Sequence, residues 1–146
     1  MTGPARLGDR AVARRLESLA EIVAFCNDAL AGSALSAADR HTLDFTLEEL
    51  FTNMLKYSAG GVNPVRITLD GEADGGVRVT LVDTGVEPFD VTAAPDANTA
   101  APLQARRPGG LGLHLLKRLA GELSYEYRAA TRESRIGFRV PRTRAC

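Results

Sequence analysis

A two-residue alternation of side-chain polarity within residues 76–83 constrains the fold more than any other feature of this sequence. The apolar positions of the alternation are Val77, Val79 and Leu81. This period predicts a β-strand that has one face in the core and one face outside it. A second strand is predicted over residues 65–70, and the turn-forming residues 71–75 join the two. The apolar face of such a hairpin needs a covering layer.

Two helices predicted before the hairpin can supply that layer. In the first, over residues 16–31, apolar side chains recur at spacings of three and four. These side chains are Leu16, Leu19, Ile22, Val23, Cys26 and Leu30. Gly32 is the expected C-terminal cap of this helix. Ser36 and Asp39 have the spacing of a capping box, which predicts a second helix from there to about residue 58.

The remaining segments complete the pattern. A helix that opens on glycines is predicted over residues 109–121, and a closing hairpin over 123–128 and 134–140. Residues 10–15 give a weak signal for an extra edge strand. Because helices and strands are segregated along the chain, we expect an α+β sandwich with a mixed, mostly antiparallel sheet covered on one face by helices. The length of 146 residues fits one such domain, spanning 1–146.

The charge balance and the hydropathy pattern exclude two classes of partner. Eighteen basic side chains match 18 acidic ones, so the chain lacks the basic footprint that nucleic-acid binding needs. The apolar runs are far shorter than the roughly 20 residues that cross a bilayer. We therefore expect a cytoplasmic protein that binds neither nucleic acid nor membrane. The two cysteines, Cys26 and Cys146, match neither a disulfide framework nor a metal site.

The predicted helix 36–58 has a polar stripe directly beside its apolar stripe. At about 100° per residue, Glu49 and Asn53 fall together on the polar stripe, at the border of the core. A carboxamide oxygen in this position could bind Mg²⁺, and a carboxylate could take a proton from a nucleophile. Taken alone, the pair is more often a solvated helix edge.

Two further motifs follow along the chain. The predicted strand ends at Asp83, and Gly85 stands two residues later. A carboxylate there can accept a hydrogen bond from the amino group of adenine, and the glycine lets the backbone approach the base. Gly110, Leu111 and Gly112 open a predicted helix, whose free backbone N–H groups suit a phosphate. Each motif alone is weak, because Asp-x-Gly is usually a turn and glycine-rich turns are common.

In this order, the three motifs resemble the N, G1 and G2 boxes of the GHKL ATPase superfamily. The resemblance spans about residues 39–140 and implies the Bergerat fold, an ATP-binding α/β sandwich. Within the superfamily, the chain is most similar to the stand-alone anti-sigma-factor serine kinases of the RsbW and SpoIIAB type. The similarity rests on the chain length and on segments 48–53, 88–90 and 108–115.

The resemblance assigns roles in the first motif. It implies that Glu49 is the general base and that Asn53 coordinates Mg²⁺. Many family members carry a histidine four residues after the metal-binding asparagine, and this sequence has Tyr57 there. The role of that histidine therefore does not transfer to this chain.

The resemblance also implies the nucleotide contacts. Asp83 would hold adenine, Gly85 would shape the base pocket, and residues 91–108 would form the ATP lid. The residues that cradle the phosphates would be Gly110, Leu111 and Gly112.

The implied function is Mg·ATP-dependent phosphorylation of a serine or threonine on a small antagonist protein of the STAS type. A sigma factor is a further implied partner, and a homodimer is the implied assembly. A rival reading is a non-catalytic module in which bound nucleotide orders the lid and so controls a protein contact. A detached histidine-kinase ATP domain is less favoured, because no preceding long helix with a phospho-acceptor histidine is predicted. Glu49 favours the kinase, since a pure binding module could dispense with a base.

Overall fold

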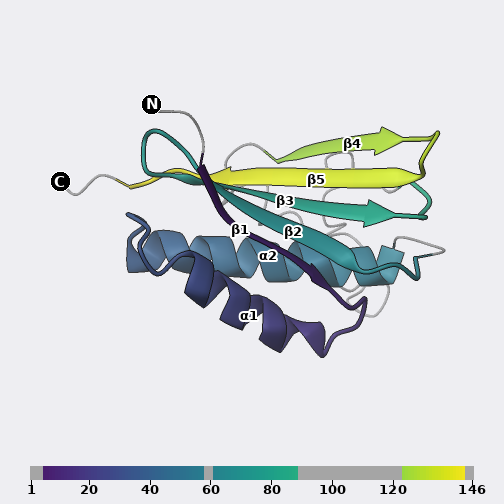
Figure 1. Ribbon diagram of the computed structural model, residues 1–146, viewed down its shortest axis with the longest axis horizontal. Helices are drawn as coiled ribbons and strands as arrows, with labels where there is room; N and C mark the ends of the chain where they lie inside the picture. Colours follow the sequence, from purple (N-terminus) through teal and green to yellow (C-terminus); the bar gives the residue numbers. More distant parts are fainter. Residues whose placement is uncertain (1–4, 58–60, 89–122, 144–146) are drawn as a thin grey trace, which may run out of the picture.

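A five-stranded sheet and two helices make up the part of the chain that the computed structural model describes, residues 5–57, 61–88 and 123–143. In chain order, the elements are β1 (Ala5–Val12), α1 (Ser18–Ala29), α2 (Ala37–Tyr57), β2 (Val65–Gly71), β3 (Val77–Thr84), β4 (Ser124–Arg128) and β5 (Glu133–Val140). The strand order is β1-β2-β3-β5-β4. Both helices lie on one face of the sheet (Figure 1), which confirms the predicted α+β sandwich. Every pairing between the described strands is antiparallel, so the mixed character that we expected is not seen among them.

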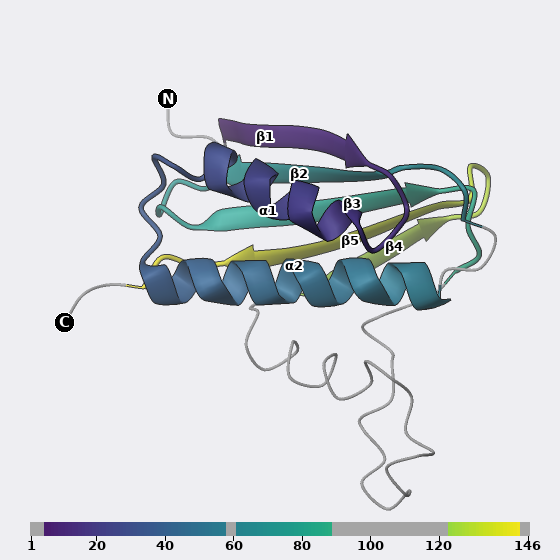
Figure 2. The same cartoon turned by 90° about the horizontal axis from the view of Figure 1, so that it is seen from below.

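The hydrophobic core fills the space between the sheet and the two helices. On β3, the apolar positions of the alternation are fully buried, as predicted. They face a buried stripe on α2 that consists of Leu43, Leu47, Leu50 and Met54. Seen from the helix side, α1 and α2 lie next to each other across the sheet (Figure 2). Each fully buried side chain of this kind contributes about 1.5–3 kcal/mol of hydrophobic free energy, so this layer fixes α2 against the sheet.

The N-terminus of α2 is closed by the predicted capping box. The backbone N–H of Asp39 donates to the Ser36 hydroxyl at 3.1 Å, and the backbone N–H of Ser36 donates to the Asp39 carboxylate at 3.5 Å. The same carboxylate accepts the backbone N–H of Thr143 at 2.8 Å, which ties the C-terminal segment to α2. Although burial of Asp39 opposes its ionisation, the hydrogen bonds from Thr143 and Ser36 prevail and lower its pKa. The cap thus sets where α2 begins and which side chains face the sheet.

The first helix is shorter than predicted. It covers 18–29 in place of 16–31, and its C-terminal cap is Leu30, not Gly32. The side chains of Leu16 and Val23 are 57% and 40% exposed, although both lie on the predicted apolar stripe. The stripe that α1 buries is therefore narrower than the sequence periodicity indicates.

The edge strand β1 also differs from its prediction. Its pairing with β2 runs from Ala5 opposite Gly71 to Val12 opposite Val65, so the strand starts five residues before the predicted 10–15. Val12 is the one fully buried residue of β1. An edge strand with so little apolar surface leaves no alternation for the sequence to reveal. No helix within the described ranges is long and apolar enough to cross a membrane.

Candidate functional site

The polar stripe of α2 places Glu49 and Asn53 one helical turn apart. The Asn53 side chain is fully buried, whereas that of Glu49 is half-buried. Asn53 Nδ2 donates a hydrogen bond to the backbone oxygen of Glu49 at 2.7 Å. This bond fixes the orientation of the carboxamide, because Oδ1 must then lie on the other side. Within the described ranges, Asn53 Oδ1 has no hydrogen-bond partner.

A buried carboxylate stands at the C-terminal end of β3. Asp83 is 0% exposed, and its backbone pairs with Ser134 of β5. Arg14, two residues after the end of β1, forms an ion pair with it through Nη2 and Oδ1. Burial raises the pKa of Asp83, and the Arg14 guanidinium opposes this shift without cancelling it.

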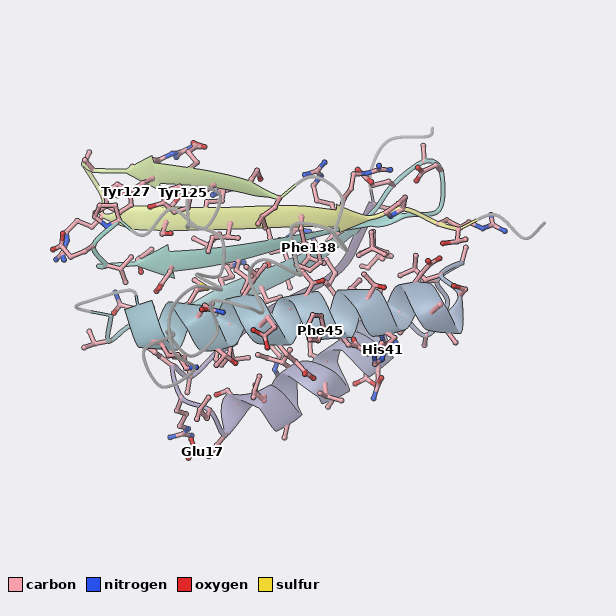
Figure 3. The ribbon with its side chains drawn as sticks, turned by 180° about the vertical axis from the view of Figure 1, so that it is seen from behind. Glu17, His41, Phe45, Tyr125, Tyr127 and Phe138 are labelled. Atoms are coloured by element: carbon pink, nitrogen blue, oxygen red, sulfur yellow. The ribbon has the colours of Figure 1, made fainter. Side chains whose placement is uncertain are left out.

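The backbone after Asp83 turns sharply and is held in place. Gly85 has a φ of 68°, a left-handed conformation that glycine adopts without strain. Asn63 Nδ2 donates to the backbone oxygen of Thr84 at 3.2 Å. On β4, the Tyr127 hydroxyl donates to the backbone oxygen of Val86 at 2.7 Å (Figure 3 labels Tyr127). The strand end and the glycine turn therefore form a fixed wall, as a base pocket would require.

Arg14 is a part of this region that the sequence reasoning missed. Its side chain is only 10% exposed. Besides Asp83, it contacts α2, where Nη1 donates to the backbone oxygen of Met54 at 3.3 Å. It thereby bridges the end of β3 and the residue that follows Asn53. The one signal in the sequence was that Arg14 lies within the weakly predicted edge strand over residues 10–15.

Three residues hold the buried side-chain atoms that lack a hydrogen-bond partner in the described part of the chain. These atoms are Arg14 Nε, Arg14 Nη2, Asn53 Oδ1, Asp83 Oδ1 and Asp83 Oδ2. The ion pair accounts for Arg14 Nη2 and Asp83 Oδ1, which leaves Arg14 Nε, Asn53 Oδ1 and Asp83 Oδ2. Buried polar atoms in native proteins nearly always have partners, so each exception asks for an explanation. Their concentration in residues at the ends of β1, α2 and β3 is what a polar ligand site would produce.

The other predicted site residues cannot be placed beside these. Gly110, Leu111, Gly112 and the predicted lid over 91–108 lie outside the residues that the structure describes. Of the predicted set, the structure describes Glu49, Asn53, Asp83 and Gly85.

The donor set in the described region fits a lightly held Mg²⁺ and not a protein metal cage. Among these residues there is no group of three or more His, Cys, Asp or Glu side chains that could hold a metal ion. Mg²⁺ keeps several waters and often takes only one or two protein oxygens, and Asn53 Oδ1 is a buried oxygen that has no partner among the described residues.

A comparison with known protein families identifies the fold family. The family model described as a histidine kinase-like ATPase domain matches residues 12–136, most of the chain. The chain belongs to this family. The match confirms the superfamily that the three ordered motifs indicated, and it includes every residue of the candidate site.

A solved structure has the same fold as this ATPase domain. It is the crystal structure of the RsbU and RsbW domains of Rv1364c from Mycobacterium tuberculosis, with a TM-score of 0.62 and 15% sequence identity. The alignment covers 99% of this chain and 34% of the other, so the ATPase domain spans about a third of that protein's length. At this identity the likeness shows the fold alone. No curated protein matches the sequence.

Proposed function

We propose that this chain is a Mg·ATP-dependent protein serine/threonine kinase of the anti-sigma-factor type, which phosphorylates a small STAS-type antagonist protein. The observation that carries the proposal is the Asn53 carboxamide. Its Nδ2 is fixed by the backbone oxygen of Glu49, and its Oδ1 is buried without a partner in the described ranges. This oxygen is one turn from the Glu49 carboxylate, on a helix of an ATPase domain.

Asn53 Oδ1 would hold the metal. A neutral amide oxygen is a suitable ligand for a hard cation, and its fixed orientation means that little side-chain entropy is lost on binding. When bound, Mg²⁺ would neutralise charge on the phosphates of ATP.

Asp83 and the turn after it would recognise the base. The carboxylate lies at the end of a buried strand, where it can accept a hydrogen bond from the amino group of adenine. Gly85 has a left-handed backbone and no Cβ, so its backbone could approach the flat face of the base. We propose that Gly110, Leu111 and Gly112 cradle the phosphates and that residues 91–108 form the lid, as the resemblance implies.

Glu49 would serve as the general base. The serine or threonine oxygen of the antagonist would attack the γ-phosphorus of ATP, and the bond between that phosphorus and the β–γ bridging oxygen would break. The hydroxyl proton would pass to the Glu49 carboxylate, and ADP would leave. Because Glu49 is half-buried, its carboxylate can reach a substrate without leaving the helix edge.

The transferred phosphate would act as a switch on the partner. It adds about 1.5–2 negative charges at neutral pH to the surface that the kinase recognises, so the phosphorylated antagonist would dissociate. A sigma factor would then compete for the freed surface, and a homodimer of domains 1–146 is the assembly that we propose for this exchange.

Phosphotransfer by the full chain tests the proposal. The wild type is incubated with labelled ATP, Mg²⁺ and a STAS-type antagonist, and Glu49→Gln should transfer phosphate roughly 10²–10⁴-fold more slowly with nearly unchanged ATP affinity. Glu48→Gln is the matched control, because Glu48 is the adjacent glutamate and lies off the polar stripe. Transfer by Glu49→Gln at the wild-type rate would contradict the kinase mechanism and favour a nucleotide-gated binding module.

A further inference from the structure

We propose that Arg14 is the counter-ion that keeps the Asp83 carboxylate ready for the nucleotide base, with one carboxylate oxygen serving Arg14 and the other serving the base. This inference rests on the proposed function, in which Asp83 contacts adenine. It assigns Arg14 a positioning role, since Arg14 would act on the nucleotide through Asp83.

The geometry divides the carboxylate between two partners. Arg14 Nη2 faces Asp83 Oδ1 in the ion pair. Asp83 Oδ2 is buried and has no hydrogen-bond partner among the residues that the structure describes. An amino group of the base would supply the missing donor without displacing Arg14.

The arginine is held from three directions, unlike a side chain that swings freely in solvent. The turn that presents it is closed by the Ser18 hydroxyl, which donates to the backbone oxygen of Ala13 at 2.6 Å. Its Nη1 donates to the backbone oxygen of Met54 on α2. On the third side lies Gly61, where any Cβ would overlap the guanidinium. Arg14 therefore reaches Asp83 from the turn between β1 and α1, past the end of α2.

The positive charge of Arg14 favours the ionised form of Asp83, which is the form that best accepts a hydrogen bond from the base. An ionised carboxylate only accepts hydrogen bonds, whereas a protonated one has lost its negative charge and carries a donor on one oxygen, so it would hold an amino group less strongly. Burial raises the pKa of Asp83, and in the described part of the chain Arg14 is the one charged group that acts against this shift. Without Arg14, only the backbone hydrogen bond from Thr84 would oppose burial, so the pKa of Asp83 would rise further and the carboxyl would keep its proton to higher pH.

A different role for Arg14, as a group that blocks the pocket, predicts the opposite change in nucleotide affinity. If the guanidinium blocked the base, nucleotide would have to expel it, and removing it would strengthen binding. If it were the counter-ion, removing it would weaken binding in a pH-dependent way.

Calorimetry of ATP binding to the full chain distinguishes the two roles. Arg14→Met should bind ATP about tenfold to a hundredfold more weakly than the wild type at neutral pH. The loss should shrink as pH rises, because Asp83 then ionises without help. Over the pH range in which the loss shrinks, binding to Arg14→Met should also release protons, which is measured by repeating the titration in buffers of different ionisation enthalpy. Arg14→Lys should restore part of the affinity and the wild-type pH profile.

Control variants make each outcome decisive. Arg10→Met removes an arginine from the same edge, one that is 51% exposed and paired with Glu21, and should change nothing. If Arg14→Met fails to fold, Arg14→Gln removes the charge but keeps length and hydrogen-bond donors, and the same pH profile is expected. Tighter binding, unchanged binding, or an equal loss at every pH would each overturn the counter-ion role of Arg14.

The variant Asp83→Asn separates the two proposals. If it weakens ATP binding while Arg14→Met does not, only the counter-ion role is wrong. If neither variant changes ATP binding, the assignment of Asp83 to the base pocket is wrong as well.

Discussion

Removing either partner of the Arg14–Asp83 ion pair should destabilise the fold strongly, and removing both should not. The Arg14 side chain is 10% exposed and that of Asp83 is 0% exposed, so neither charge can be solvated in place. Loss of one partner from a buried pair costs about 3–5 kcal/mol, whereas replacing both by apolar residues of similar volume is often neutral or stabilising.

A double-mutant cycle measures this coupling. Asp83→Leu and Arg14→Met should each lower the free energy of unfolding by about 3–5 kcal/mol, which for a domain of this size lowers Tm by roughly 6–20 °C. The double variant should recover most of that loss. Urea denaturation followed by circular dichroism gives the four free energies, and a loss in the double variant equal to the sum of the single losses would refute the buried pair.

The same cycle, repeated at several pH values, also tests the direction in which the free energy of unfolding changes with pH. In Arg14→Met, burial acts on Asp83 without its counter-ion, so the pKa of Asp83 lies still further above its unfolded value. The folded state then holds the proton more tightly than the unfolded state, and the free energy of unfolding should fall as pH rises through that range. The exposed pair of Arg66 and Asp9 is the control, because solvent and salt screen it and it should show no comparable coupling.

Three further predictions concern other contacts. Asn53→Ala should weaken the Mg²⁺ dependence of ATP binding as well as turnover, because it removes an oxygen ligand; titration of ATP with and without Mg²⁺ checks this, and equal dependence in both proteins would contradict it. Tyr127→Phe removes the donor to the backbone oxygen of Val86 and should cost about 1–3 kcal/mol in unfolding free energy, and ATP affinity should fall with it. Because the folded pKa of Asp39 is lowered, its stabilisation is present at neutral pH and is lost as pH falls below about 4, so Asp39→Asn should be less stable at pH 7 and show a flatter acid limb in denaturation.

Features fixed by local chemistry could be predicted from the sequence. The capping box of Ser36 and Asp39 and the alternation on β3 depend on neighbours within a few residues, and both form as expected. The same reasoning brought Glu49 and Asn53 to one stripe of α2.

Features that depend on distant partners could not be predicted. The pairing of Arg14 with Asp83 joins residues far apart in sequence, and only the strand order brings the end of β1 near the end of β3. The exposure of Leu16 and Val23 follows from how much of the sheet α1 covers, which helical periodicity alone does not reveal. Asn53 was expected at the core border, and its complete burial depends on the layers around α2.

ATP binding by Asp83→Asn tests the central claim most directly, because the base pocket is the part of the site that the described residues define best. Asn keeps the size of the side chain, and thermal unfolding confirms that the variant is folded at the temperature of the titration. Asp70→Asn is the matched control, since Asp70 is paired with Arg6 on β1 and not with any pocket residue that the structure describes. We predict that the wild type and Asp70→Asn bind ATP equally, while Asp83→Asn loses about 1–3 kcal/mol of binding free energy, about a tenfold to hundredfold weaker Kd. Equal affinity in all three proteins would contradict the assignment of Asp83 to the base and, with it, the proposed nucleotide site.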